Sequence, residues 1–112
     1  MLKNDTGQTT MSGIVTHAGD PRIVLWDGLA VDARPSGVLM AVRNEDVPGV
    51  VGFIGSTLGE AKINISQISW GRNPDSDEAR TLLNLDSAPE ALVLESIQKH
   101  PAIQWAKLAQ FE

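Results

Sequence analysis

The chain contains no cysteine, no long apolar run and no excess of basic residues. Without cysteine it has no disulfide, no thiolate metal site and no cysteine nucleophile, and nothing ties it to an oxidising compartment. No stretch approaches the roughly 20 apolar residues of a membrane helix, and the region after Met1 has no signal-peptide core. A formal net charge of −5 leaves no basic stripe that could displace phosphate counterions. We therefore expect a cytoplasmic protein without nucleic-acid or membrane partners.

Motifs for catalysis, metals and cofactors are also missing. The sequence shows no HExxH, no serine nucleophile elbow and no P-loop. His17 follows a predicted strand and is expected to be solvated, whereas His100 is expected in the last turn of a helix, where the dipole favours positive charge. The acidic residues of one predicted loop tip are too few and too irregular for a calcium site; they are Asp75, Asp77 and Glu78. We predict no catalytic residue, no metal and no cofactor.

The first third of the 112 residues has the pattern of short strands and turns. Residues 1–12 are polar and lack periodicity, which indicates a frayed lead-in. Ile23–Trp26 and Leu29–Asp32 are β-prone runs joined by Asp27-Gly28, the strongest short signal for a hairpin. The turn-forming residues 34–37 then end this region. We place a boundary there.

The remaining two thirds alternate between strand and helix periodicity. The predicted elements are, in order, a strand at Val38–Val42, a helix with apolar Val50, Ile54, Leu58 and Ala61, strands at Asn64–Arg72 and Ala79–Asp86, a helix opened by a capping box at Ser87–Glu90 with Ala91, Leu94 and Ile97 inward, and a strand at Ile103–Phe111. This order predicts an α+β, ferredoxin-like fold, with a four-stranded antiparallel sheet and two helices on one face. Residues 1–37 form a β-hairpin extension and residues 38–112 the main domain.

Two residue types in these elements have a packing interpretation. Gly52, Gly55 and Gly59 share one face of the first helix, which lets it lie close to a sheet or to a neighbouring molecule. The spacing does not match the G-x-G-x-x-G fingerprint of a dinucleotide site. The three tryptophans have no basic companions, so we expect them in the core or in an interface rather than on a stacking platform for bases; they are Trp26, Trp70 and Trp105.

A polar corner between the first strand and the first helix is the candidate binding site. Residues 44–49 combine an amide, two acids, proline and glycine, and Asn64 begins the next strand. Free N–H groups in the first turn of a helix attract a carboxylate, and Asp46 could bind an ammonium group. A free amino acid has ends that complement such a cup. Alternatively, Asp46 only caps the helix and Asn64 only ends a loop.

Two motifs resemble the signatures of the ACT domain, a small regulatory module. Arg43–Gly52 resembles the signature D-x-P-G-v-[IL]-g, and Leu58–Ser66 resembles l-g-e-x-x-i-N-I. Ala79–Asp86 is similar to the family's strand that ends in aspartate. Upstream, the residues around Gly19–Val24 and Asp27-Gly28 resemble the end of the allosteric substrate-binding domain of bacterial D-3-phosphoglycerate dehydrogenases. The resemblance implies the C-terminal regulatory region of that enzyme, without its catalytic and nucleotide-binding domains.

The resemblance also implies a ligand and its site. In that family L-serine binds between two ACT domains and inhibits the enzyme, so L-serine or a related small amino acid and a homo-oligomer, at least a dimer, are the expected partners. Asn44 and Asp46 would line the site on one subunit, and Asn64 would come from the facing subunit. Val47 and Ile65 would contribute backbone groups.

Three other interpretations remain open. The domain could be an assembly module without a ligand, or the ACT-containing regulatory fragment of an L-serine dehydratase. The dehydratase fits less well because Asp20–Val24 follows the dehydrogenase pattern. A standalone enzyme is the weakest interpretation, since no pair of nucleophile and base is visible.

Overall fold

The computed structural model describes residues 2–4, 7–9 and 11–111. Its helices are α1 (Val50–Glu60) and α2 (Ala91–Gln98). Its strands are β1 (Leu2–Asn4), β2 (Gly7–Thr9), β3 (Met11–Val15), β4 (Pro21–Trp26), β5 (Leu29–Ala33), β6 (Gly37–Glu45), β7 (Ile65–Arg72), β8 (Glu78–Leu85) and β9 (Ile103–Phe111).

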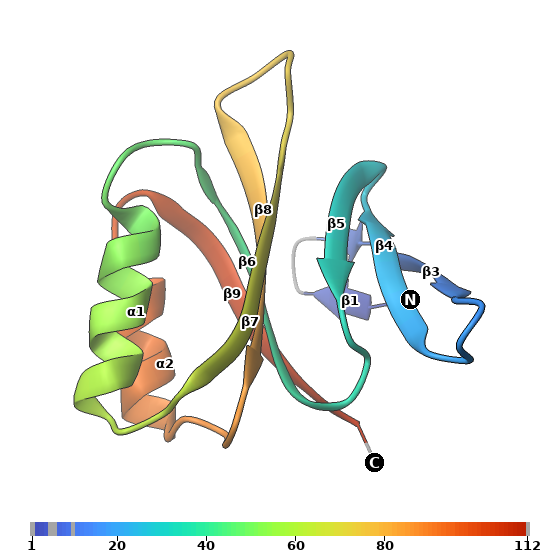
Figure 1. The fold of residues 1–112 in the computed structure, drawn as a ribbon. Helices are drawn as coiled ribbons and strands as arrows, with labels where there is room; N and C mark the ends of the chain where they lie inside the picture. The colour runs from blue at the N-terminus through green and yellow to red at the C-terminus, as the bar shows by residue number, and fades with distance from the viewer. Residues whose placement is uncertain (1, 5–6, 10, 112) are drawn as a thin grey trace.

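The main domain is built on a four-stranded sheet with the order β7-β8-β6-β9. Each neighbouring pair is antiparallel. Both helices lie on one face of this sheet, and the three-stranded sheet β3-β4-β5 lies on the other face (Figure 1). The prediction of a ferredoxin-like α+β fold is therefore confirmed, with the N-terminal strands as an additional layer.

The core between the sheet and the helices is apolar. Strand residues alternate between the two faces of a sheet, and Met40, Val42 and Leu83 point toward the helices and are fully buried. α1 meets them with apolar residues at helical spacing, as predicted from the sequence: Val50, Ile54 and Leu58. α2 contributes Ile97. This packing fixes the position of α1 and hence of its first turn, which borders the candidate site.

The opposite face of the sheet carries a second, smaller apolar cluster. Trp26 of β4 is fully buried there, and its ring centroid lies 5.7 Å from that of Trp105 on β9. The predicted hairpin is present, because β4 and β5 pair antiparallel on either side of Asp27-Gly28. Both turn residues have positive φ, 50° and 81°, as a type I′ turn requires. β3 adds a third strand to this hairpin.

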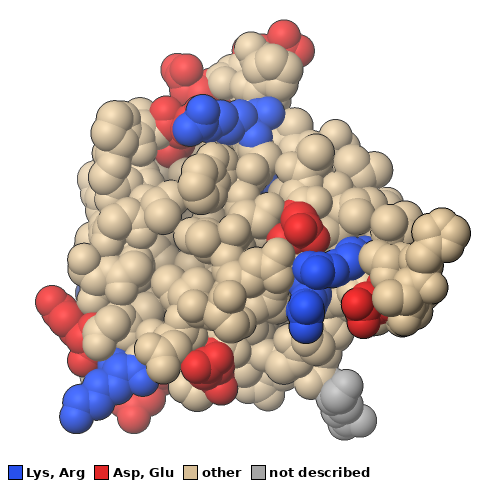
Figure 2. All heavy atoms as spheres, in the orientation of Figure 1, with Lys and Arg blue, Asp and Glu red and all other residues tan. Residues whose placement is uncertain are grey.

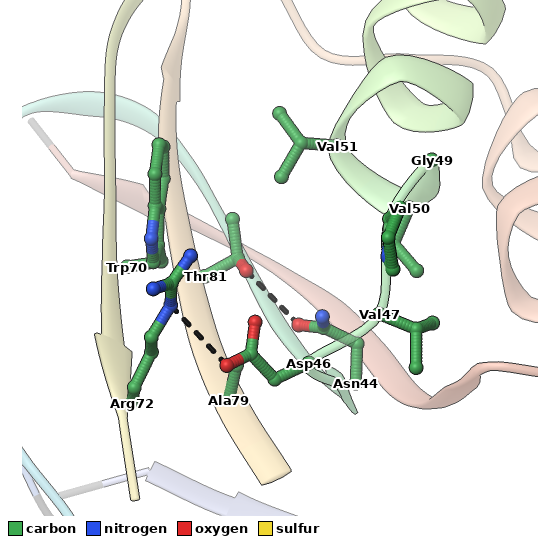
Figure 3. A pocket seen from close by; sticks show the side chains of 11 residues that line it. Asn44, Asp46, Val47, Gly49, Val50, Val51, Trp70, Arg72, Ala79 and Thr81 are labelled. Atoms are coloured by element: carbon green, nitrogen blue, oxygen red, sulfur yellow. Dashed lines mark hydrogen bonds and ion pairs between the residues drawn. The ribbon is translucent and has the colours of Figure 1, made fainter. Parts of the chain in front are cut away.

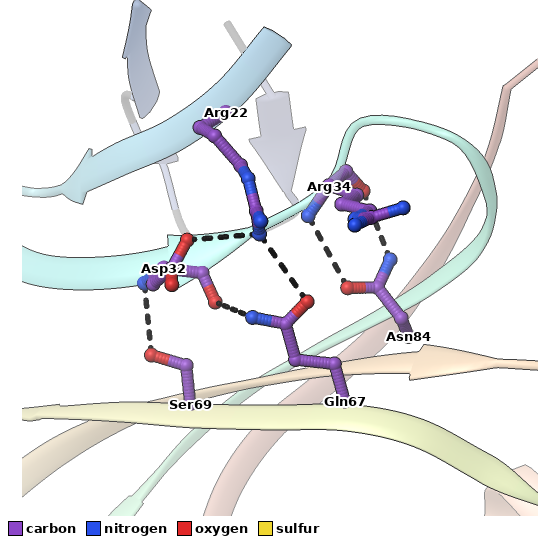
Figure 4. Close-up of polar contacts among 6 residues, drawn as sticks. All are labelled: Arg22, Asp32, Arg34, Gln67, Ser69 and Asn84. Atoms are coloured by element: carbon purple, nitrogen blue, oxygen red, sulfur yellow. Dashed lines mark hydrogen bonds and ion pairs between the residues drawn. The ribbon is translucent and has the colours of Figure 1, made fainter. Parts of the chain in front are cut away.

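Side-chain hydrogen bonds attach β5 and the linker after it to the main sheet (Figure 4). The side chain of Asn84 accepts a hydrogen bond from the Arg34 amide at 3.2 Å and donates one to the Arg34 carbonyl at 2.9 Å. On β7, the Ser69 hydroxyl accepts from the Asp32 amide, and Gln67 donates to the Asp32 carbonyl. β5 and β7 also approach closely at Gly71, where an added Cβ would lie 2.5 Å from the Ala30 oxygen. β7 is therefore held firmly on the face away from the helices.

Two predictions at chain ends and caps are wrong. The polar lead-in over residues 1–12 contains strands β1 and β2, which pair antiparallel, and β3 already begins at Met11; residues 1, 5, 6 and 10 lie outside the described part. The capping box at Ser87–Glu90 does not form. Instead Glu90 is the N-cap in an extended conformation, without a side-chain cap hydrogen bond.

The predictions for α2 also need correction. Ala91 is exposed rather than inward, whereas Leu94 is partly buried and Ile97 is fully buried. The helix ends at Gln98, so His100 lies beyond its last turn. The His100 ring packs on Phe53 of α1 with centroids 4.6 Å apart, and its Nδ1 accepts a hydrogen bond from the Ala102 amide. Local turn structure and packing, rather than the helix dipole, fix this histidine.

Candidate functional site

An open pocket of about 430 Å³ lies where β6 leads into α1. Its floor consists of two rows that cross the sheet. One row contains Asn44, Ala79 and Arg72, and the other contains Thr81 and Trp70. The loop before α1 and the first turn of the helix form the facing wall (Figure 3). This volume is within the range of small-molecule sites.

Asn44 is buried at the bottom of this pocket, with 4% of its surface exposed. Its side-chain oxygen accepts a hydrogen bond of 2.9 Å from the Thr81 hydroxyl, and its side-chain nitrogen donates to the Glu45 carbonyl at 2.9 Å. The amide plane is therefore fixed by the protein. One N–H of the amide group remains available for a further acceptor.

Asp46 lies at the mouth of the pocket and pairs with Arg72 of β7. Asp46 Oδ2 and Arg72 Nε are 3.2 Å apart. The backbone around Asp46 is anchored from two directions, because the Asp46 amide donates to the Asp77 carbonyl and the Glu45 amide donates to the Ala102 carbonyl. The loop that carries the carboxylate is thus held in place before any ligand binds.

The first turn of α1 presents backbone N–H groups to the same pocket. The N-cap is Gly49, in the left-handed conformation with φ 94°, and no side chain caps the helix. The alternative that Asp46 is merely the helix cap is therefore wrong. Val50 and Val51 follow in the pocket wall, and N–H groups of a first turn have no carbonyl partner within their own helix. Such a turn favours a negatively charged ligand group.

The structure brings together only part of the predicted site. Asn44, Asp46 and Val47 line the pocket, but Asn64 and Ile65 stand at the opposite end of β7 from Arg72. Asn64 is exposed, and its backbone carbonyl accepts a hydrogen bond from the Asp86 amide. Within one copy of the chain, Asn64 therefore cannot reach a ligand held by Asp46.

Sequence reasoning missed the residues that β7 and β8 contribute. Trp70 and Arg72 alternate with Ile68 on the helix-facing side of β7, and Thr81 is opposite Trp70 on β8. Period-two alternation could have grouped Ile68, Trp70 and Arg72. The strand order that sets them beside the β6–α1 loop depends on long-range pairing, which a local pattern does not contain.

The surface around the pocket is apolar and lacks a covering layer. Val47, Val51 and Trp70 are 42%, 37% and 45% exposed, and the area over α1 and β7 in Figure 2 shows few charged side chains. A Cβ added to any of the three helical glycines predicted to allow a close approach would meet nothing within 4 Å. β7 is an outer strand whose described pairing is with β8 alone. We call the surface formed by Val47, Val51, Trp70 and the glycine face of α1 the open face.

Searches for metal and membrane features gave negative results over the described residues. In residues 2–4, 7–9 and 11–111, no group of three or more histidine, cysteine or acidic residues could hold a metal ion. Within the same ranges, neither helix has the length and hydropathy needed to cross a membrane.

Comparison with known proteins gives consistent relatives. No family model matches the chain. It is 32% identical over 100 residues to D-3-phosphoglycerate dehydrogenase of Bacillus subtilis, and 38% over 84 residues to that of Methanocaldococcus jannaschii. These matches cover 89% and 75% of the chain but 19% and 16% of the relatives. A chloroplastic D-3-phosphoglycerate dehydrogenase 2 of Arabidopsis thaliana is 31% identical over 90% of the chain and 16% of its own length. The chain is therefore homologous to a region that makes up less than one fifth of D-3-phosphoglycerate dehydrogenases.

Proposed function

We propose that this region is an ACT-type regulatory module that binds L-serine or a related small amino acid and thereby controls a D-3-phosphoglycerate dehydrogenase. In this proposal the chain is not a catalyst by itself, because it corresponds to less than one fifth of the dehydrogenases it resembles. The relatives reported above favour a dehydrogenase as the parent over the L-serine dehydratase alternative.

The pocket at the β6–α1 corner carries the proposal. It places a carboxylate, Asp46, and the free N–H groups of a helix start in one cavity. A zwitterionic amino acid needs an acceptor for its ammonium group and donors for its carboxylate. The buried Asn44, fixed by Thr81, is a further donor at the pocket floor. Few other small metabolites have this combination of charges on adjacent atoms.

A second copy of the chain would complete the site. β7 is an outer strand with a free edge, which can pair with another strand. If two β7 strands pair antiparallel about Ile68, Asn64 of the second copy lies opposite Arg72 and hence beside the pocket. Two-fold symmetry makes two such sites. This arrangement accounts for why Asn64 is far from Asp46 within one copy.

Binding at this seam would regulate the parent enzyme by changing how two copies pack. A ligand shifts such an equilibrium only to the extent that it binds one arrangement better than the other. Coupling energies of this kind amount to about 1–3 kcal/mol, which corresponds to roughly 5- to 150-fold changes in affinity.

A second candidate function is assembly without a ligand. The open face and the free edge of β7 support it, because an apolar area and a glycine-lined helix suit close packing against another copy. In that case the pocket would be a gap at the dimer seam. The two candidates differ in a single observable, the response of the protein to amino acids.

The test is calorimetric titration with L-serine, glycine and L-alanine, combined with sedimentation velocity. We expect L-serine binding to a dimer, and at least tenfold weaker binding in Asp46→Asn and in Asn64→Ala. Asp20→Asn, an exposed acid in a distant turn, is the matched control and should bind like the parent chain. A stable dimer that gives no heat with any of these amino acids at millimolar concentration would support assembly alone and contradict the sensor.

A further inference from the structure

We propose that Arg72 is the residue that recognises the carboxylate of the ligand and makes the pocket specific for amino acids over amines. This inference rests on the proposed function, since it concerns the same pocket. Sequence motifs do not include Arg72, and only the pairing of β7 with β8 sets it beside the pocket.

The contacts of Arg72 leave most of its hydrogen-bonding capacity unused. Its Nε pairs with Asp46 Oδ2 at 3.2 Å, and within the described residues its two Nη groups form no other hydrogen bond or ion pair. Figure 3 shows the guanidinium between the Trp70 ring and the Asp46 carboxylate, at the edge of the cavity. Asp46 therefore orients Arg72 through one nitrogen and leaves the others for a ligand.

The two charged groups match the two ends of an amino acid. Asp46 Oδ1 has no hydrogen bond or ion pair within the described residues and can accept from an ammonium group. The Nη groups of Arg72 can donate to a carboxylate, and guanidinium–carboxylate pairs are among the stronger hydrogen-bonded ion pairs in proteins. In this arrangement the Asp46–Arg72 pair persists on binding and becomes the centre of a four-group chain of alternating charge.

A competing role for Arg72 predicts the opposite result. If Arg72 merely occupies Asp46 in the free protein, then the ammonium group of the ligand must displace it, and removal of Arg72 would tighten binding. If Arg72 recognises the carboxylate, its removal weakens binding. The sign of the change therefore separates the two roles.

The experiment compares L-serine with L-serinamide, which keeps the ammonium group and lacks the carboxylate. Arg72→Gln should weaken L-serine binding roughly ten- to a hundredfold, as expected for a charged hydrogen bond, and should change serinamide binding less than twofold. Arg72→Lys should restore part of the L-serine affinity. Arg34→Gln, which removes an exposed arginine far from the pocket, is the control.

Each outcome has a defined meaning. Tighter L-serine binding in Arg72→Gln, or equal loss for both ligands, would overturn the inference while the sensor function stands. Absence of amino-acid binding to the parent chain would instead overturn the proposed function. If serinamide binds too weakly to fit, the ¹⁵Nε resonance of Arg72 decides, because L-serine must shift it. An unchanged resonance would contradict the assignment.

Discussion

The two faces of the four-stranded sheet are covered in different ways. Toward the helices, the buried residues are apolar, and Met40, Ile54 and Leu83 lie entirely away from solvent. Toward β3-β4-β5, a smaller apolar cluster around Trp26 is combined with polar side-chain contacts such as the Asn84–Arg34 pair. The comparison teaches that burial holds the helix layer, whereas directional hydrogen bonds and close backbone approach fix where the N-terminal sheet lies.

Leu83→Ala tests the helix-facing side and should have the largest effect. Removing a fully buried leucine side chain should destabilise the fold by about 2–5 kcal/mol because of lost burial and a residual cavity. Urea unfolding followed by circular dichroism measures this change. Leu92→Ala, at a position 73% exposed, is the control and should change stability by less than about 0.5 kcal/mol. Equal effects would show that this face is not the main core.

Gly71→Ala tests the close approach of the N-terminal sheet. The added methyl group would lie 2.5 Å from the Ala30 carbonyl oxygen, so β5 must move, at a cost of about 1–3 kcal/mol. Gly59→Ala adds the same methyl group in open space on α1 and should stabilise the monomer by up to about 1 kcal/mol through helix propensity. If both substitutions act alike in urea unfolding, the contact between β5 and β7 is looser than described.

Asn84→Ala tests the directional contacts and should have an intermediate effect. It removes two hydrogen bonds to the Arg34 backbone, which together should contribute about 1–2 kcal/mol. Hydrogen exchange of the Arg34 amide should accelerate more than that of amides in β6. Uniform acceleration across the chain would show that the linker does not open separately from the main sheet.

Arg22→Ala should have the smallest effect. Arg22 and Asp32 form an ion pair at 3.2 Å, and the Asp32 side chain is 62% exposed. Exposed pairs of this kind contribute about 0–1 kcal/mol and are weakened by salt. The change in unfolding midpoint should therefore shrink further at high ionic strength. A loss as large as that of Gly71→Ala would place charge, rather than shape, at the centre of this interface.

The fold of residues 38–112 was largely predictable, because its signals are local. Apolar spacing in α1 and the Asp27-Gly28 turn follow from side-chain periodicity and from the positive φ that such a turn requires. The α2 cap was not predictable in the same way. Ser87 matched a capping pattern, yet Glu90 occupies the N-cap, since the chain after β8 is set by tertiary packing.

The site was predictable only on its loop side. Asp46 and Asn44 stand in a short contiguous segment, so the sequence pattern locates them. Arg72 and Trp70 reach the same pocket through the pairing of β7 with β8, and strand order is a long-range property. The N-terminal layer was predicted as a hairpin, whereas its third strand, β3, was only partly anticipated.

An NMR titration of the ¹⁵N-labelled chain with L-serine tests the central claim most directly. The account predicts saturable shifts at the amides of Val47, Val50 and Val51, at the Asn44 side chain and, through a second copy, at the Asn64 side chain. These shifts should follow one binding curve. Saturable shifts confined to the N-terminal sheet, or no shifts at millimolar L-serine, would contradict a serine-binding pocket at the β6–α1 corner.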